Sequence, residues 1–407
     1  MNIFTKINII NNIQHVRKKY IRYIYIESIE RAVGIQAANQ FIRSMEQNDI
    51  IDTPTICVSD PANVRTWEWV AGLDCKPKMS QEELIKLSKS SIDPFKLVEK
   101  DLSNISSGIK DLLGSDHPVL ESCAKYFFEL DGGKKIRPAM VLAVSYALSG
   151  QALNHLDNSN NLQFCTTSQK RLAEITEMIH TASLFHDDVI DKASTRRNVA
   201  SVNQIFGNKL AILGGDFLLS RASVYLARLR NVEVVELLST VIEHLVKGEV
   251  MQMKPSNTGN SALIYYLKKN FYKTASLMGH SCLAAAVLGD YSEAQKRACY
   301  LYGTYIGQSF QLIDDCLDFE GTTLSLGKAP LADLKSGLAT APTLFATEEF
   351  PELIVLINRK FESPGDVDEA LSIVQKSQGL IKSRDLAQVH AEKAIESIMT
   401  LGPSTAR

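Results

Sequence analysis

Apolar residues recur at helical intervals along most of this chain. The first clear stripe follows Pro94 and repeats every three or four residues: Val98, Leu102, Ile105, Ile109 and Leu112. Spacing of this kind places the apolar side chains on one face of a helix. The segment from Gly114 to Pro118 is rich in helix-breaking residues, so we expect the stripe to end there.

Similar patterns predict further helices at residues 119–130, 137–149, 170–191, 203–229, 232–253, 262–289, 292–319, 338–347, 351–361, 366–377 and 379–399. No segment shows the alternation of apolar and polar residues that a half-buried strand would have. The apolar stretch from Thr274 to Gly289 is shorter than a membrane span and contains His280, so we interpret it as a buried helix. We therefore predict an all-α helical bundle without a membrane span.

Composition narrows the classes of function. The chain has 407 residues, of which 45% are apolar and 22% charged, which is ample for a large core. Its 44 Lys and Arg residues nearly balance its 46 Asp and Glu residues, whereas a nucleic-acid-binding protein would carry a basic excess or stripe. The seven cysteines are scattered, with no CxxC pair. They predict free thiols in a reducing compartment.

The N-terminal part differs from the rest. Residues 1–26 contain basic but no acidic side chains and lack the apolar run of a secretory signal, which indicates a mitochondrial transit peptide. An ordinary basic tail is the alternative. Residues 27–91 show no sustained period and include Pro-, Ser- and Asn-rich stretches, so we interpret them as a linker or extension. The helical domain is predicted to span residues 92–407.

An acidic cluster ends the helix predicted at 170–191. Asp187, Asp188 and Asp191 lie within about one turn, with no cation in the same turn, and like charges at this spacing destabilise a helix. A divalent metal carrying a phosphorylated ligand would neutralise them, since Mg²⁺ favours one or two carboxylates plus substrate phosphates. For one such cluster alone, a solvated acidic turn is the more common explanation.

The same spacing returns 127 residues later, at Asp314, Asp315 and Asp318, again within an apolar helical pattern. If the two helices face each other across a bundle, they form a site of up to six carboxylates, as bundle interiors commonly do for metals. So much buried negative charge requires cations. The pair of clusters therefore predicts a central cavity that both of them line.

Separated basic residues accompany the two clusters: Lys134 and Arg137 in GGKKIRP, Arg196 and Arg197 after the first cluster, Lys273 before Thr274, and Lys328 after the second cluster. Arg offers a planar fork that matches phosphate, and Lys a point charge. This combination describes a pocket for polyphosphate esters, and for more than one of them.

Seven segments carry a family resemblance, in the order DGGKKIRP, EMIHTASLFHDDVIDKASTRR, GGDFLLSRA, KGEVMQM, YKTASLM, GQSFQLIDDCLDF and LADLKSGLATAP. In order and spacing they resemble the trans-polyprenyl diphosphate synthases, above all the long-chain mitochondrial enzymes that make the ubiquinone side chain. The resemblance covers about residues 92–407. It implies the isoprenoid-synthase helical bundle, with a central cavity lined by the two aspartate-rich motifs.

The resemblance also implies site roles. Metal ligands would be Asp187, Asp191 and Asp314, with Asp188, Asp315 and Asp318 completing the catalytic clusters; two or three Mg²⁺ ions are expected. The allylic diphosphate would contact Arg196, Lys273, Thr274, Gln311 and Lys328. Isopentenyl diphosphate would contact Lys134, Arg137, His180 and Arg197. A satisfied core histidine is the alternative for His180, but it lies two turns before Asp187 and hence on the same face.

The implied reaction needs positioning and electrostatics rather than a side-chain nucleophile. An allylic diphosphate, farnesyl or geranylgeranyl, would ionise and then be attacked by isopentenyl diphosphate. Ala182 and Ser183 lie about one turn before Asp187, and both are small. They would leave room for a chain longer than C15–C20. The family further implies a homodimer or heteromer, a location on the matrix side of the mitochondrion, and peripheral contact with the inner membrane.

Two alternatives remain open at this stage. A class I terpene cyclase shares the fold and one DDxxD motif but does not need GGKKIRP. A non-catalytic subunit of a heteromeric synthase typically lacks one aspartate cluster, and both clusters are present here. Asn198 and the loop GKAPLADL depart from the family pattern, which leaves the role of Lys328 less firmly supported.

Overall fold

The structure is a computed structural model that describes residues 77–80, 83, 93–114, 117–129, 134–149, 165–196, 199–253, 260–320 and 330–402. The chain divides into two compact units, residues 1–66 and 67–407, and all described residues belong to the second. The predicted transit peptide and most of the predicted linker lie outside the described residues.

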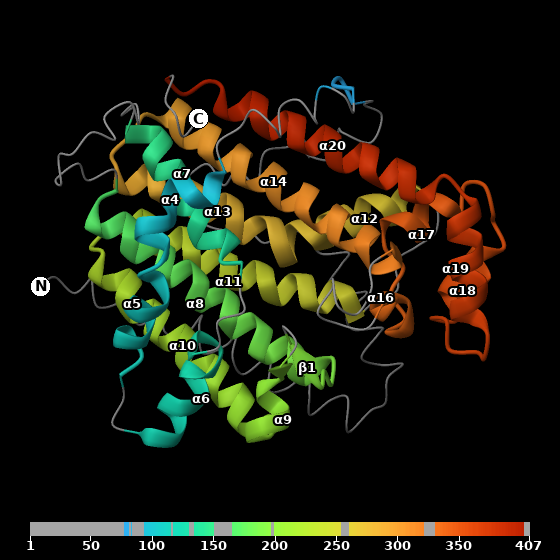
Figure 1. The fold of residues 1–407 in the computed structure, drawn as a ribbon, viewed down its shortest axis with the longest axis horizontal. Coiled ribbons are helices and arrows are strands. Elements are labelled where there is room, and N and C mark those ends of the chain that lie inside the picture. The colour runs from blue at the N-terminus through green and yellow to red at the C-terminus, as the bar shows by residue number, and fades with distance from the viewer. Residues whose placement is uncertain are drawn as a thin grey trace, which may run out of the picture. The chain divides into compact units, whose positions relative to one another are not determined.

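The described part is almost entirely helical (Figure 1). Its first half contains α4 (Pro94–Leu102), α5 (Ile105–Leu112), α6 (Pro118–Glu129), α7 (Ile136–Ser149), α8 (Thr167–Ile190), β1 (Thr195–Arg196), β2 (Val199–Ala200), α9 (Val202–Phe206), α10 (Asn208–Arg228) and α11 (Val232–Met253). Its second half contains α12 (Asn260–Asn270), η3 (Phe271–Ala275), α13 (Ser276–Leu288), α14 (Glu293–Glu320), α16 (Ala332–Lys335), α17 (Ala341–Ala346), α18 (Leu353–Asn358), α19 (Asp366–Lys376) and α20 (Gly379–Ile398). The predicted all-α fold is confirmed.

The helix boundaries agree with the predicted ones to within a few residues, with four local exceptions. The stripe after Pro94 is divided between α4 and α5, and the helix predicted at 203–229 is divided at Gly207, whose φ is 81°. The helix predicted at 262–289 contains the π-helical turn η3. A short antiparallel hairpin pairs Thr195 with Ala200, because the chain must reverse between α8 and α9. The pattern of apolar residues predicted none of these four features, because each depends on the local conformation of the backbone and not on apolar spacing.

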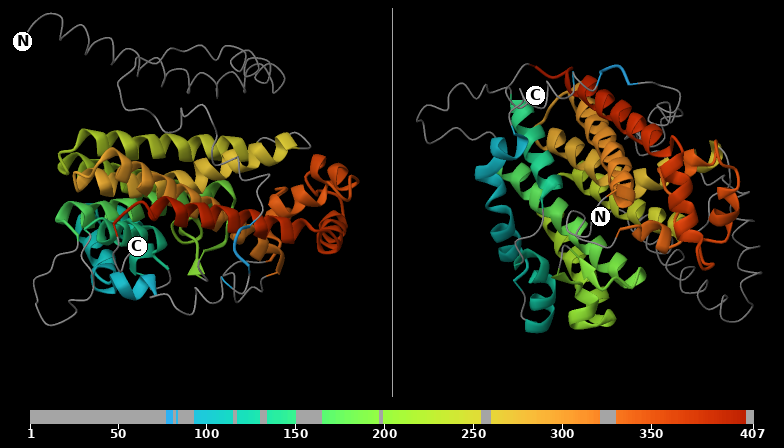
Figure 2. Two further views of the ribbon diagram at one scale, coloured as in Figure 1. Left: turned by 90° about the horizontal axis from the view of Figure 1, so that it is seen from above. Right: turned by 45° about the vertical axis from the view of Figure 1, so that its right-hand side comes forward.

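Helix α13 lies at the centre of the bundle. Every residue from Ser276 to Val287 is buried, and Figure 1 shows α7, α8, α11 and α14 around it. The interpretation of this stretch as a buried helix is therefore confirmed. Two further views show α20 running back along α14 and the short helices α16 to α19 gathered at one end (Figure 2). This end holds the loop that follows the second aspartate cluster.

A glycine fixes the close approach of α14 to the π turn. A Cβ atom at Gly307 would lie 2.4 Å from the Cα atom of Ala275, closer than any side chain tolerates. Because Gly307 has no side chain, α14 packs directly against the backbone of η3. This contact brings Gln311 and Asp314, one and two turns further along α14, to the same side as Lys273 and Thr274.

Helix α8 begins with a capping box, in which the Thr166 hydroxyl accepts from the Gln169 N–H at 3.1 Å and Gln169 Oε1 accepts from the Thr166 N–H at 2.9 Å. Such reciprocal bonds satisfy two otherwise orphaned donors at a helix start. The helix ends at Ile190, with Asp191 as its C-cap. The first aspartate cluster thus occupies the last turn of a helix that is fixed at its start and buried along most of its length.

Helix α10 requires a correction to the sequence prediction. By length and composition it is apolar enough to cross a membrane, and a third of its most apolar window (33%) is buried within the fold. It packs along α8 and α6, so part of its apolar character belongs to the core. The remainder faces outward at Ile212, Leu213 and Val224.

Candidate active site

A cavity of about 670 Å³ lies where α7, α8, η3 and α14 meet. Eleven of the residues predicted for the site line it: Lys134, Arg137, His180, Ser183, Asp187, Asp191, Arg196, Lys273, Thr274, Gln311 and Asp314. They come from segments up to 180 residues apart in the sequence, residues 134 to 314. The structure thus brings members of both predicted aspartate clusters together with four of the predicted basic residues, Lys134, Arg137, Arg196 and Lys273.

One wall of the cavity carries the residues assigned to isopentenyl diphosphate. Arg137, near the start of α7, lies with its Nη1 atom 3.1 Å from Nε2 of His180 on α8. Lys134 precedes α7 and lines the same cavity. His180 is therefore a cavity residue that contacts a guanidinium group, and the alternative of an enclosed core histidine is wrong. Arg197 lies outside the described residues.

The first aspartate cluster divides between two environments. Asp187 and Asp191 line the cavity. Asp188 is fully buried and accepts hydrogen bonds from Nε and Nη2 of Arg196, at 2.9 and 2.5 Å. This ion pair differs from the predicted roles: Asp188 does not line the cavity, and the guanidinium of Arg196 is held by a carboxylate at the cavity edge.

In the second aspartate cluster, fewer carboxylates line the cavity than in the first. Of its three carboxylates, only Asp314 lines the cavity. Asp315 is buried and accepts from the hydroxyl of Tyr266 at 2.5 Å and from Nε2 of Gln311 at 2.8 Å. Asp318 is fully buried and accepts from the backbone N–H groups of residues 332 and 333, at 3.3 and 3.1 Å. The expected site of up to six carboxylates is therefore reduced to three that face the cavity.

The π turn supplies two of the residues assigned to the allylic diphosphate, Lys273 and Thr274. Single π turns inside α-helices occur frequently at functional sites. Here the amine of Lys273 pairs with Glu249 and donates to Oε1 of Gln252 at 3.1 Å. The hydroxyl of Thr274 donates to Oε1 of Gln311 at 2.7 Å. Gln311 in turn donates a hydrogen bond to Asp315, so the second aspartate cluster and the π turn belong to one hydrogen-bond network.

Gly248 allows Glu249 to reach Lys273. A Cβ atom at Gly248 would lie 2.6 Å from Cγ of Lys273 and 3.0 Å from its backbone nitrogen. Only glycine lets α11 approach the π turn so closely, and the next residue then meets the lysine amine. The segment KGEVMQM belongs to the family resemblance, but its spacing alone gave no role to Glu249.

Sequence reasoning also gave no role to several other polar residues that line the cavity, among them Gln252 and Lys269. Lys269 precedes Lys273 by four residues, and its amine lies 5.3 Å from the centre of the Tyr266 ring. Burial lowers its pKa, and the negative charges of Asp315, Asp333 and Glu249 oppose that shift. The only signal in the sequence was a second lysine one turn before the first, which an exposed helix face would show equally.

Of the two predicted chain-length residues, one lines the cavity and the other does not. Ser183 lines it, and its hydroxyl donates to the carbonyl of His180 at 2.8 Å. Ala182 is fully buried in the hydrophobic core. Lys328, predicted to contact the allylic diphosphate, lies outside the described residues.

The electrostatics of the cavity fit a divalent metal. Burial, together with the negative charges of Glu249 and Asp191 and against the opposing effect of Lys273, raises the pKa of Asp187 to about 6. Within the described residues, no group of three His, Cys, Asp or Glu side chains converges into a ready-made metal site. Mg²⁺ does not need one, because it keeps several waters and binds through one or two carboxylates plus substrate phosphates. Asp187, Asp191 and Asp314 line the cavity and could supply the hard oxygen donors for that mode.

Comparison with known proteins points the same way. A family model described as polyprenyl synthetase matches residues 117–374. Solanesyl-diphosphate synthase 1, mitochondrial, of Oryza sativa subsp. japonica is 45% identical over 339 residues, which are 81% of this chain and 78% of that protein. The human all trans-polyprenyl-diphosphate synthase PDSS1 is 45% identical over 317 residues, 77% of this chain and 74% of that protein.

Solved structures share the fold. The crystal structure of polyprenyl synthase from Caulobacter crescentus CB15, complexed with calcium and isoprenyl diphosphate, is similar with a TM-score of 0.67 and 30% sequence identity. The match covers 77% of this chain and 92% of that one. The helical bundle inferred from the resemblance is therefore confirmed.

Proposed function

Because the chain belongs to the polyprenyl synthetase family, we propose that it is a trans-polyprenyl diphosphate synthase, a transferase that adds isopentenyl diphosphate units to an allylic diphosphate. Its product is a long all-trans prenyl diphosphate, as the names of its relatives indicate, and the proposed use of that product is the ubiquinone side chain. The observation that most strongly supports the proposal is that carboxylates from both aspartate clusters line a single cavity together with two separate sets of basic and polar residues.

Asp187, Asp191 and Asp314 would hold Mg²⁺, two or three ions in all, against the allylic diphosphate. When bound, Mg²⁺ neutralises the leaving diphosphate and lowers the barrier to ionisation. The three carboxylates suit this role because they face the cavity, whereas Asp188, Asp315 and Asp318 have partners within the fold. The divalent calcium and isoprenyl diphosphate bound by the Caulobacter relative support the assignment.

The residues of the chain position two diphosphates. Lys273, Thr274 and Gln311 hold the allylic diphosphate at the π turn. Lys134, Arg137 and His180 hold isopentenyl diphosphate beside it, so that its double bond faces the reacting carbon. Holding both reactants in this way supplies much of the rate enhancement without a nucleophile.

The bonds then change in order. The allylic C1–O bond breaks and the diphosphate leaves with the electron pair. The double bond of isopentenyl diphosphate attacks the allylic cation to form the new carbon–carbon bond. A proton then leaves the resulting cation, restoring a double bond, and the departing diphosphate accepts it. The product is an allylic diphosphate five carbons longer, ready for another addition.

Ser183 favours a long product, because a small side chain on the cavity side of α8 leaves space for the growing chain. Ala182 supports the same outcome indirectly, by letting neighbouring core residues pack close to α8. An aromatic residue at position 183 would block the cavity. S183F should therefore shorten the product, as measured by chromatography of labelled prenols.

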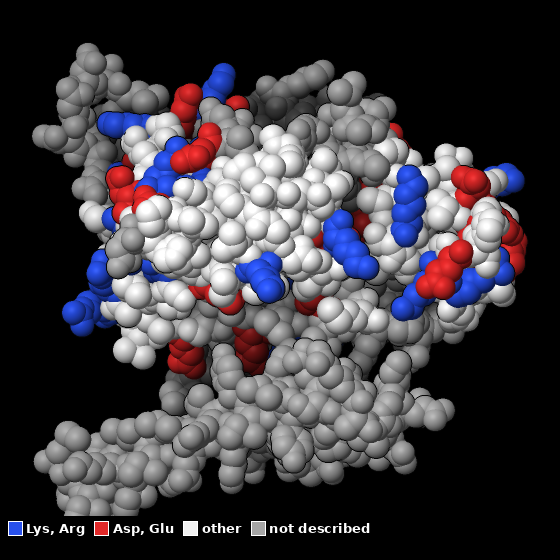
Figure 3. Space-filling model, turned by 90° about the horizontal axis from the view of Figure 1, so that it is seen from below, with Lys and Arg blue, Asp and Glu red and all other residues white. Residues whose placement is uncertain are grey.

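The outer faces of α10 and α11 favour self-association. Ile212, Leu213 and Val224 on α10 and Val246 and Val250 on α11 are all at least two-fifths exposed (41–54%). Seen from below, the side where Figure 1 places α9 and α10, charged side chains are sparse across the middle and gather towards the two ends (Figure 3). Exposed apolar patches of this kind mark protein interfaces. A homodimer is the proposed state, and L213E should convert it to a monomer in light scattering.

A mitochondrial location follows from the relatives whose names include it, and the basic, acid-free N-terminus agrees. The matrix side of the inner membrane is proposed because the product is lipophilic. Fusion of residues 1–26 to a fluorescent protein would test the targeting role. Cytosolic fluorescence would contradict it.

A single assay tests the proposed activity. The purified chain with Mg²⁺, farnesyl diphosphate and labelled isopentenyl diphosphate should yield long prenyl products, and chelation of Mg²⁺ should stop the reaction. Incorporation only after a second subunit is added would indicate a co-catalytic subunit instead. Cyclic hydrocarbon products would indicate a terpene cyclase.

A further inference from the structure

A second, smaller cavity adjoins the main one. Its volume is about 220 Å³, and it lies between the ends of α11 and α18, helix α12 and the loop after α16. Five residues line both cavities: Asp191, Gln252, Lys269, Ser336 and Leu338. The two cavities therefore share a wall at the place where the diphosphate and its metal are expected. We call the smaller one the side cavity.

The shared wall carries an amine without a direct ion pair. No carboxylate among the described residues forms an ion pair with Lys269, although the negative charges of Asp315, Asp333 and Glu249 act on it from a distance. Its amine lies 5.3 Å from the centre of the Tyr266 ring. Burial disfavours the charged form of this amine, and a phosphate group in either cavity would stabilise that form by direct contact.

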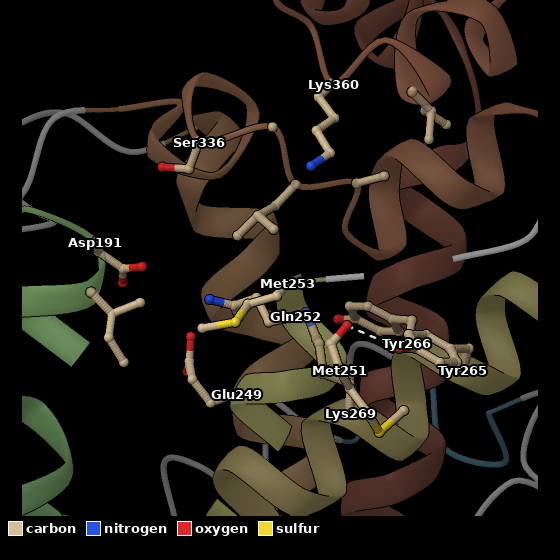
Figure 4. Close-up of a pocket in the computed structure, with 15 residues that line it drawn as sticks. Asp191, Glu249, Met251, Gln252, Met253, Tyr265, Tyr266, Lys269, Ser336 and Lys360 are labelled. Carbon is tan, nitrogen blue, oxygen red and sulfur yellow. Dashed lines mark hydrogen bonds between the residues drawn. The ribbon is translucent and has the colours of Figure 1, made fainter. Parts of the chain in front are cut away.

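The outer rim carries a second lysine, whose side chain is exposed to solvent. Lys360 lines the side cavity, and no ion pair joins it to any residue in the described ranges. Its neighbour Arg359, in contrast, donates to Asp366 from Nε at 2.7 Å. In Figure 4, Lys360 reaches in from the side of α18 with its amino group directed into the cavity. Of these two adjacent cations, Arg359 has a carboxylate partner, whereas Lys360 has none among the described residues and faces the side cavity.

The backbone fixes Lys360 in that position. Lys360 and Phe361 both have left-handed φ values, 54° and 55°, which residues with a side chain adopt only at a cost. Gly337, with a φ of 78°, faces Lys360 so closely that a Cβ atom there would lie 3.1 Å from Cβ of Lys360. This conformation also follows other helices, at Lys192, Arg230 and Asp290, and here it fixes the point from which the Lys360 side chain extends.

Two acidic residues of the side cavity define the form of the ligand. Asp191 and Glu249 lie where it meets the main cavity, and Glu249 is already paired with Lys273. A bare polyanion would be repelled by Asp191, whereas a diphosphate that keeps a Mg²⁺ ion would satisfy Asp191 through the metal and the two lysines through its oxygens. The small volume suits a diphosphate group and excludes a long prenyl chain.

We propose that the side cavity is an exit site for the diphosphate released in each condensation, with Lys269 as its inner and Lys360 as its outer cation. The inference rests on the proposed synthase function, because each added unit releases one diphosphate. The elongated chain remains in the main cavity, so the leaving diphosphate requires a separate way out. The side cavity provides it directly beside the position where the C1–O bond breaks.

The test uses the full chain with Mg²⁺, and with both substrate positions filled by isopentenyl diphosphate and an unreactive farnesyl thiolodiphosphate. Radiolabelled inorganic diphosphate should then bind at one further site per chain. K360M should weaken this binding about tenfold or more, the usual loss for a contact with a charged group. K376M, which changes an exposed lysine on α19 outside both cavities, should bind the label as the wild-type chain does.

Three outcomes would overturn the exit site. The first is no labelled diphosphate bound by the wild-type chain, and the second is equal binding by K360M. The third is displacement of the label by excess thiolodiphosphate with two analogue molecules bound per chain, which would assign the side cavity to the head group of a prenyl substrate. Failure of the analogue to bind even once would instead overturn the proposed synthase function, and the exit site with it.

Discussion

The two aspartate clusters have the same spacing in the sequence but unequal positions in the structure. The cluster at the end of α8 presents two carboxylates to the cavity, Asp187 and Asp191, and the cluster on α14 presents one, Asp314. The others are buried and engaged by protein groups: a guanidinium for Asp188, a hydroxyl and an amide for Asp315, and two backbone N–H groups for Asp318. Identical motifs therefore do not imply identical roles for their members.

The difference follows from where each cluster lies on its helix. The first cluster ends α8, so the chain that follows turns back through the β1–β2 hairpin and delivers Arg196 to Asp188. The second lies near the end of α14, beside α12 and the α16 segment, which supply Tyr266 and the backbone of residues 332 and 333. In each case the carboxylates on one side of the helix line the cavity, and those on the other side bind neighbouring segments of the chain.

The largest effects should come from carboxylates that face the cavity. D187N and D314N each remove one charge that would hold the metal, so kcat should fall about 10²–10³-fold, as for other transition-state charge contacts. This corresponds to about 3–4 kcal/mol in the activation free energy. Steady-state incorporation of labelled isopentenyl diphosphate measures it. Thermal stability should change less than kcat, because both side chains line the cavity and neither is fully buried.

The matched control is D368N, which alters an exposed carboxylate on α19 and should leave kcat unchanged. Retention of more than half of the activity in D314N would refute its assignment as a metal ligand. The two clusters would then differ far more than the structure indicates.

The ion pair of Asp188 with Arg196 should matter first for stability. R196M leaves a fully buried carboxylate without its cation, and breaking a buried pair of this kind costs about 3–5 kcal/mol in the free energy of unfolding. D188N/R196M should recover part of the loss, because the unpaired charge is gone. Urea denaturation of the single and double variants gives the coupling energy. Strictly additive effects would show that the pair contributes no interaction of its own.

Asp318 should show the same pattern with a smaller effect. Its carboxylate accepts from two successive backbone N–H groups, and in D318N one of them would face an amide donor instead. Loss of a hydrogen bond to a charged group costs about 1.5–3 kcal/mol, so the unfolding free energy should fall by about 2 kcal/mol. Protease cleavage near residues 330–335 should become faster. An unchanged melting temperature would contradict the structural role of Asp318.

The sequence predicted the bundle, its central helix and the cavity residues correctly because all of these depend on apolar periodicity and on motif residues spaced by whole helical turns. The spacing alone did not separate the aspartates that line the cavity from the buried ones, although the family resemblance assigned the metal to Asp187, Asp191 and Asp314, the three that line it. That division depends on partners such as Arg196 and Tyr266, brought in by the hairpin and by α12, and no spacing within the motif encodes it. The π turn was missed for the same reason, since it depends on the close contact of Gly307 with Ala275.

Removal of the Tyr266 hydroxyl should give the smallest effect and the clearest view of how the second cluster is held. Y266F leaves one oxygen of the buried Asp315 without its 2.5 Å hydrogen bond, while Gln311 still donates to the other. A cost of about 1 kcal/mol is expected for one lost hydrogen bond. Because Gln311 also accepts from Thr274, the loss should reach the π turn and raise KM for the allylic diphosphate more than KM for isopentenyl diphosphate.

Y265F is the matched control, because its hydroxyl donates to the carbonyl of Met251 and not to an aspartate. Equal changes in both KM values would show that Asp315 supports the whole cavity and not the allylic side alone.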